Sequence, residues 1–193
     1  MAGEGQVSKL PCDNGPLKGG KGQLYEGGTR VPALANWPGH LKPGSIVNEV
    51  IHVVDMFPTL ARLAGASTAK CKPLDGADVW PAMAEGKTSG RAEVVYNIEP
   101  FRGAVRQGDW KLVWRSLLPS KVELFNLAND PNELTNLAGQ QPEQVKLLQA
   151  RIEQLAGEAA PPLIQAEAYR AIFGGLFGPA PLPTDDAASA EVP

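Results

Sequence analysis

The feature that most constrains the fold of this chain is the stretch GAVRQGDWKLVW, residues 103–114. Its side chains alternate in character with a period of two, which is typical of a β-strand. Residues 107–109 (QGD) interrupt this alternation with a tight-turn sequence. The large apolar side chains that share one predicted face are Trp110, Leu112 and Trp114. Lys111 and Val113 belong to the opposite face, so the pattern predicts an antiparallel hairpin with two distinct surfaces.

Two flanking segments extend this hairpin into a small sheet. Residues 94–98 (VVYNI) and 121–127 (KVELFNL) are further strand candidates, which predicts three or four antiparallel strands. A helix is expected to begin at Pro142, because proline suits the first helical turn. The apolar positions that recur at helical spacing are Val145, Leu148, Ile152 and Leu155. We expect this apolar face to cover the sheet.

The first half of the chain has a different character. Residues 11–50 are rich in Gly and Pro and are expected to form ordered loop. Residues 51–65 predict a short strand that runs into a helix, with Asp55 as the N-cap and Gly65 at the C-terminal end. The expected buried stripe of this helix consists of Leu60, Leu63 and Ala64.

Composition excludes several classes of protein. Eighteen basic and 21 acidic side chains give a net charge of −3, which argues against a nucleic-acid-binding surface. No apolar run reaches the roughly 18 residues of a membrane span. Residues 1–11 lack the apolar stretch of a signal peptide. Two cysteines, Cys12 and Cys71, are too few for a disulfide scaffold.

Residues that could carry chemistry gather near the N-terminus. Asp13 and Asn14 offer adjacent oxygen ligands suited to calcium or magnesium, although Asp-Asn-Gly is also a common turn sequence. GPLKGGKG, residues 15–22, nearly matches a phosphate-binding P-loop. Gly22 stands where that motif needs Ser or Thr, which argues against nucleotide binding. Lys21 is therefore either a lysine that meets an anion among backbone N–H groups or an exposed loop lysine.

Five blocks of sequence, in order, resemble the sulfatases of the formylglycine-dependent arylsulfatase type. These blocks are DNGPLKGGKGQLYEGGTRVPALANWPG, HVVDMFPTLARLAGA, PLDGADVWPAM, RGAVRQGDWKLVW and VELFNLANDPNELTNLA. The resemblance extends over roughly residues 12–158. It implies an α/β protein, namely the C-terminal part of an alkaline-phosphatase-like sulfatase fold, with a small antiparallel sheet packed by a C-terminal helix.

The resemblance also implies roles for a few residues. Asp13 and Asn14 match the family's Asp-Asn pair, which binds the active-site calcium. Lys21 matches the lysine that contacts the sulfate group of the substrate. Glu26 and Arg30 are interpreted as structural residues that hold this loop.

The family's nucleophile is a formylglycine made within a C/S-x-P-x-R motif, and this chain lacks a match. Cys71 begins CKPLD, but Asp75 stands where the arginine is required, so Cys71 is interpreted as an ordinary thiol. Cys12 has no matching context either. His52 is interpreted as a packing or capping residue, and His40 as a loop residue that follows Pro38-Gly39. We therefore expect a C-terminal portion whose partner is a missing N-terminal sulfatase part.

These observations predict three parts. Residues 1–92 form the incomplete C-terminal end of the catalytic α/β domain, residues 93–159 the sheet and helix, and residues 160–193 a partly disordered Pro- and Ala-rich extension. Two functions stay open. The chain contributes calcium and sulfate contacts to a sulfuric ester hydrolase acting on a sulfate ester, or it is an inactive remnant that serves as a binding module. The family is usually secreted, periplasmic or lysosomal, and the localisation of this chain stays open.

Overall fold

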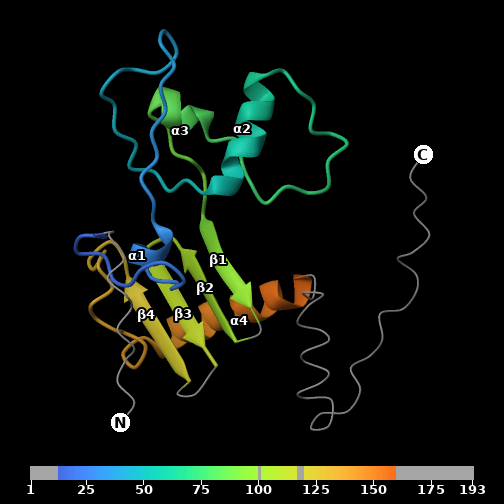
Figure 1. Ribbon diagram of the computed structural model, residues 1–193. Coiled ribbons are helices and arrows are strands. Elements are labelled where there is room, and N and C mark those ends of the chain that lie inside the picture. The colour runs from blue at the N-terminus through green and yellow to red at the C-terminus, as the bar shows by residue number, and fades with distance from the viewer. Residues whose placement is uncertain (1–12, 100, 117–119, 160–193) are drawn as a thin grey trace, which may run out of the picture. The chain divides into compact units, whose positions relative to one another are not determined.

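The computed structural model describes residues 13–99, 101–116 and 120–159 (Figure 1). The expectations for Cys12 and for residues 160–193 lie outside these residues. The described residues up to Gly157 form one compact unit. None of the helices in the described ranges has the length and apolar character needed to cross a bilayer.

The strands form a four-stranded antiparallel sheet, as the alternation predicts (Figure 1). Its strands, in spatial and sequence order, are β1 (Glu93–Glu99), β2 (Arg102–Gln107), β3 (Trp110–Arg115) and β4 (Lys121–Asn126). Gln107 pairs with Trp110, which leaves Gly108 and Asp109 as a two-residue turn. Gly108 has φ +56°, the left-handed conformation that glycine adopts at little cost in such turns.

Helix α4 (Pro142–Glu158) covers one face of the sheet (Figure 1). Leu148 and Ile152 of α4 pack against Val105, Leu112 and Leu124 of the three strands β2 to β4. The predicted face of Trp110, Leu112 and Trp114 contributes to this cluster, so the hairpin and helix predictions are confirmed.

The opposite face of the sheet is covered by the segment that leads into helix α1 (Glu26–Thr29). Leu24 and Tyr25 of this segment pack on Ala104, Val113 and Phe125 of the sheet. The sheet is therefore covered on both faces, and Lys111, which shares a face with Val113, is removed from water.

The short strand predicted at the start of residues 51–65 is absent, because the chain there is irregular and leads into a 3₁₀ turn, η1 (Val53–Asp55). Helices α2 (Met56–Leu63) and α3 (Trp80–Glu85) follow. The predicted stripe of α2 is wrong: Leu60 is 61% exposed, Ala64 is exposed and Leu63 is half-buried. Thr59 is buried in their place, since its hydroxyl donates to Asp55 O and accepts from Val79 N.

Asp55 precedes α2 but does not cap it, because its carboxylate connects three other segments. It accepts from His52 N at 2.7 Å and from Ala77 N at 2.9 Å, and it is paired with Arg91. Burial alone raises the pKa of the Asp55 carboxyl, but the Arg91 guanidinium and the two backbone donors outweigh it and hold the pKa below its usual range.

Replacing Asp55 by Asn is expected to lower the free energy of unfolding by about 3 kcal/mol at pH 7, because Arg91 loses its buried counter-charge. The folded-state pKa of Asp55 is depressed, so its contribution is present above the unfolded pKa of about 3.9 and is lost as the pH falls through the folded-state value. Urea unfolding at several pH values measures both effects.

The matched control is Asp78→Asn, since Asp78 pairs with Arg62 where both side chains are partly exposed. This variant should lose less than about 1 kcal/mol. Equal losses in the two variants would contradict the role given to Asp55.

Candidate functional site

The candidate site lies on the irregular loop of residues 13–25, which precedes α1. This loop carries all three residues that the sequence singles out, Asp13, Asn14 and Lys21. All three are exposed in the described structure. The loop is therefore a surface that a ligand can reach.

Asp13 and Asn14 form a turn that also presents oxygen atoms. Gly15 N donates to Asp13 Oδ1 at 2.8 Å, and Asn14 Nδ2 donates to Gly19 O at 3.1 Å. The other side-chain oxygens, Asp13 Oδ2 and Asn14 Oδ1, accept no hydrogen bond from the described residues. The turn and the ligand interpretations of this pair are thus compatible with each other.

The loop brings the Asp-Asn pair close to the glycines around Lys21. A Cβ added at Gly20 would lie 3.5 Å from Asn14 Nδ2, so the amide lies against the residue before Lys21. Within the described ranges, the Lys21 ammonium has neither a hydrogen bond nor an ion pair. This positive charge is available to an anion.

The described residues contain part of a cation site at most. No group of three or more His, Cys, Asp or Glu side chains in the described ranges is arranged to hold a metal ion. Asp13 and Asn14 have the hard oxygen donors that calcium prefers, but calcium takes about six to eight ligands. Further ligands must come from elsewhere for these two residues to hold the ion.

The two glycines after Glu26 allow the loop to pack against α1. A Cβ at Gly27 would lie 2.5–2.8 Å from the carbonyl oxygens of residues 17, 18 and 19. A Cβ at Gly28 would overlap the carbonyl oxygens of Gln23 and Gly20. Gly27 N donates to Lys18 O at 2.8 Å, which closes the loop around Lys21. Any larger residue at these two positions must push the loop away.

A buried ion network lies beneath this loop, and we use that term for Glu26, Lys111 and Glu133. The Lys111 ammonium, with 0% of its side chain exposed, lies 2.8 Å from Glu26 Oε1 and 2.9 Å from Glu133 Oε1. The contact with Glu133 Oε1 is an ion pair without the angles of a hydrogen bond. Glu133 Oε2 accepts from Glu26 N at 2.6 Å. The network therefore joins α1, β3 and the turn after β4.

Tyr96 completes the surroundings of Lys111. It is the extra residue of a bulge in β1, where the pairing with β2 shifts between Val95 and Asn97. Its hydroxyl donates to Glu26 Oε1 at 3.2 Å, and its ring centroid lies 4.2 Å from Lys111 Nζ. Burial is the main cause that raises the pKa of the Tyr96 hydroxyl, and the nearby Glu26 adds to it.

Glu133 shares the Lys111 ammonium with Glu26. Burial raises the pKa of the Glu133 carboxyl, with the Lys111 ammonium acting in the opposite direction. Glu133 also has φ +56°, so its backbone is held in a conformation that is uncommon for a residue with a side chain. Ion contacts thus hold Glu133 in place.

Sequence reasoning assigned Glu26 and Arg30 to holding the loop and placed Lys111 on the correct face. The partner of Glu26 is Lys111, whereas Arg30 is exposed. Glu133 was missed. A lysine in the middle of a strand whose faces are both covered needs a buried counter-charge. The sequence predicts a cover for one face of the sheet only, so this signal becomes visible only in the structure.

The other candidates have structural roles. Val54 N donates to His52 Nδ1 at 3.3 Å, so His52 caps η1 as interpreted. The His40 ring lies against Trp37, with ring centroids 4.1 Å apart. Cys71 is exposed and is not part of a disulfide.

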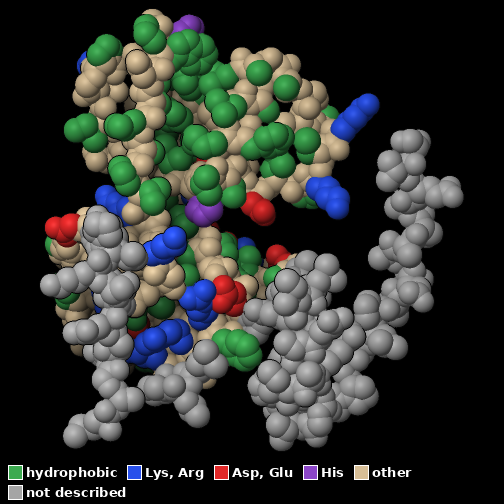
Figure 2. Space-filling view, viewed as in Figure 1, with side chains coloured by type: hydrophobic (Ala, Val, Ile, Leu, Met, Phe, Trp, Pro, Cys, Tyr) green, Lys and Arg blue, Asp and Glu red, His purple; other side chains and the backbone are tan. Residues whose placement is uncertain are grey.

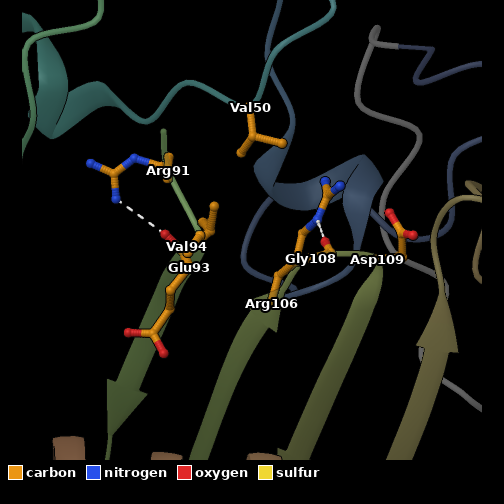
Figure 3. A pocket seen from close by; sticks show the side chains of 8 residues that line it. Val50, Arg91, Glu93, Val94, Arg106, Gly108 and Asp109 are labelled. Carbon is orange, nitrogen blue, oxygen red and sulfur yellow. Dashed lines mark hydrogen bonds between the residues drawn. The ribbon is translucent and has the colours of Figure 1, made fainter. Parts of the chain in front are cut away.

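A small polar hollow of about 180 Å³ lies near the start of β1 and the end of β2 (Figure 3). Arg91 Nη1 donates to Glu93 O at 3.2 Å, and Arg106 Nε donates to Gly108 O at 2.8 Å. None of the residues that line the hollow belongs to the loop of Asp13, Asn14 and Lys21. The hollow and the loop are built from different segments.

Comparisons with known proteins identify relatives of this chain. Residues 20–160 match the family described as "N-sulphoglucosamine sulphohydrolase, C-terminal". Arylsulfatase A of Homo sapiens is 36% identical over 183 residues, which cover 77% of this chain and 36% of that protein. Arylsulfatase J of Mus musculus is 26% identical over 216 residues, which cover 86% of this chain and 36% of that protein. The chain thus spans about a third of the length of these relatives.

The fold of this chain is also similar to that of a solved structure. The crystal structure of Ps i-CgsB matches with a TM-score of 0.69 and 27% identity, over 81% of this chain and 36% of that one.

Replacing Lys111 by Met is expected to lower the free energy of unfolding by about 3 to 5 kcal/mol at pH 7, because Glu26 and Glu133 stay buried without a counter-charge. Carboxyl groups left in this state have raised folded-state pKa values, so the loss should grow as the pH rises above about 4.3. Urea unfolding between pH 4 and pH 8 measures this.

The control combines Lys111→Met with Glu26→Gln and Glu133→Gln, which removes all three charges. This variant should recover most of the lost stability at pH 7 and lose the pH dependence. A triple variant as unstable as the single one would show that packing, rather than charge, explains the effect of Lys111.

Proposed function

The chain belongs to the sulfatase family as its C-terminal region, and on this premise we propose that it completes the active site of a sulfuric ester hydrolase of the arylsulfatase type. The family match and the four-stranded sheet confirm the predicted identity and fold of this region. The observation that carries the proposal is the anchored loop, which presents Asp13, Asn14 and Lys21 together at the surface.

In this proposal Lys21 contacts the sulfate group of the substrate. Its ammonium is exposed and has no partner among the described residues, so a sulfate ester oxygen can take that place. Negative charge moves to the leaving oxygen as the S–O bond breaks, and a fixed ammonium stabilises that charge more in the transition state than in the bound ester.

Asp13 and Asn14 would supply two of the ligands of a calcium ion, Asp13 Oδ2 and Asn14 Oδ1. When bound, the ion would polarise the sulfate group as a Lewis acid. The remaining ligands and the formylglycine nucleophile would come from an N-terminal sulfatase part. The C/S-x-P-x-R motif has no match in this chain.

The surface of the segment that carries α2 and α3 supports the existence of such a partner. Apolar side chains are spread over its visible face (Figure 2). Large apolar residues of this segment that stay exposed are Val31 (76%), Leu34 (101%), Ile46 (84%), Val53 (78%) and Leu60 (61%). So much exposed apolar surface is typical of a face that another part of the protein covers.

The first test concerns Lys21 in a longer protein, in which this chain is joined to an N-terminal sulfatase part. Lys21→Ala is expected to lower kcat for 4-nitrophenyl sulfate by about 100- to 1,000-fold, because a charge-stabilising contact of the transition state is lost. The control is Lys42→Ala, another exposed loop lysine. Unchanged turnover in Lys21→Ala would overturn the site assignment. Wild-type protein that is inactive on sulfate esters would favour a binding module.

The second test concerns the cation and reads out stability rather than activity. Calcium should raise the melting temperature of the longer protein, because a ligand that binds the folded state stabilises it. Asp13→Asn should raise the calcium concentration needed for half of this shift by about tenfold, since one charged ligand is lost. Asp75→Asn removes an exposed carboxylate from another loop and should leave that concentration unchanged.

A further inference from the structure

The two lysines of the GPLKGGKG segment have different surroundings. Lys21 is exposed, whereas Lys18 points toward the sheet and has 30% of its side chain exposed. The sequence pattern treats these residues alike, because both are lysines among glycines. The structure separates a lysine that faces solvent from one that faces the protein.

The Lys18 ammonium is enclosed by groups of the sheet and of the turn after β4. Lys18 Nζ donates to Glu123 Oε1 at 3.2 Å and to Glu133 O at 3.2 Å. It also lies 4.4 Å from the ring centroid of Tyr25 and 4.7 Å from that of Phe125. The Glu123 side chain is 3% exposed, so its charge depends on donors within the protein.

The titration of Glu123 reflects these donors. Burial alone raises the pKa of its carboxyl, but hydrogen bonds from Lys121, Tyr25 and Lys18 outweigh it and hold the pKa below the usual range. Glu123 therefore stays ionised at neutral pH and is a permanent anchor for a cation from the loop.

Lys21 lies between two such anchors. On the N-terminal side, Lys18 is tied to Glu123. On the C-terminal side, Glu26 is tied to Lys111 in the buried ion network. The hydrogen bond from Gly27 N to Lys18 O closes the segment between them. Next to Lys21, Arg102 Nη1 donates to Gly22 O at 2.7 Å.

We propose that Lys18 is a positioning residue for Lys21. The Lys18 side chain holds the Gly-rich loop, residues 13–25, on the sheet, so that the Lys21 ammonium has a fixed place. The role given to Lys21 rests on the proposed function, whereas the order that Lys18 gives to the loop does not. Without the Lys18 ammonium, residues 19–23 still form their backbone hydrogen bonds and the contact with Arg102, but these bonds open more readily because the ionic tie to β4 is lost.

The sequence offers a matched pair of variants. Lys121 also contacts Glu123 Oε1, at 2.8 Å, but it belongs to β4 and is 46% exposed. Lys18→Met and Lys121→Met therefore remove the same charge from the same carboxylate, the first from the loop and the second from the strand. Methionine keeps most of the aliphatic stem in both cases.

The decisive measurement is amide hydrogen exchange on the 193-residue chain. In Lys18→Met, the Gln23 and Gly27 amides, which donate within the loop, should exchange about tenfold faster than in the wild type. The amides of β2 and β3 should keep their rates. Lys121→Met should leave both groups of amides unchanged.

Two results would overturn the inference. Unchanged exchange at Gln23 and Gly27 in Lys18→Met would show that the loop does not need this lysine. Equal acceleration in the loop and in the sheet would show that Lys18 stabilises the whole fold rather than the loop.

Turnover by the longer protein adds a second measurement. Lys18→Met should lower kcat by about tenfold and change KM by less than about twofold, because a misplaced ammonium costs most in the transition state. Lys18→Arg should restore most of kcat, since it keeps the positive charge. A kcat that does not fall in Lys18→Met would contradict the positioning role.

Failure of the proposed function has a different signature. If Lys21→Ala kept full turnover while Lys18→Met still freed the loop amides, the assignment of Lys21 would fall and the anchoring of the loop by Lys18 would stand.

Discussion

The buried charge of Lys111 is the constraint on which the rest of the structure depends. An ammonium with no exposed surface needs counter-charges, and the chain supplies them from α1 and from the turn after β4. Glu26 and Glu133 therefore bring together segments that are distant in sequence. Such a network contributes little net stability compared with apolar packing. However, any arrangement of the chain that leaves one of its charges buried and unpaired is strongly destabilised. It fixes where the Gly-rich loop meets the sheet.

The sheet and α4 could be predicted because the spacing of apolar residues in the sequence identifies the buried face of each. The alternation around Gly108 specifies a turn and two sides, and the structure covers both sides. Helix α2 was placed correctly, but its buried stripe was not. Periodicity identifies the apolar side of a helix and not what covers it. The Thr59 hydroxyl binds the neighbouring segment through Val79 N, which leaves Leu60 exposed among the described residues.

The candidate site likewise contains residues that the sequence could identify and residues that it could not. Residue chemistry and family resemblance could single out Asp13, Asn14 and Lys21, whose roles stay predictions. The supports beneath them could not be found in this way. Glu133 lies in an irregular turn without periodicity, and Lys18 differs from Lys21 in its surroundings rather than in its local sequence. Contacts between residues about a hundred positions apart leave no mark on a short window of sequence.

The long sequence separation within the network also sets an order of events during synthesis. Glu26 and Lys111 are 85 positions apart, and Glu26 and Glu133 are 107 apart. At about 5 to 20 residues per second, the ribosome delivers Glu133 roughly 5 to 20 seconds after Glu26. The Gly-rich loop is thus made early but cannot settle until the whole sheet has left the exit tunnel. During that interval, the Gly-rich loop of a nascent chain would be accessible to chaperones and proteases.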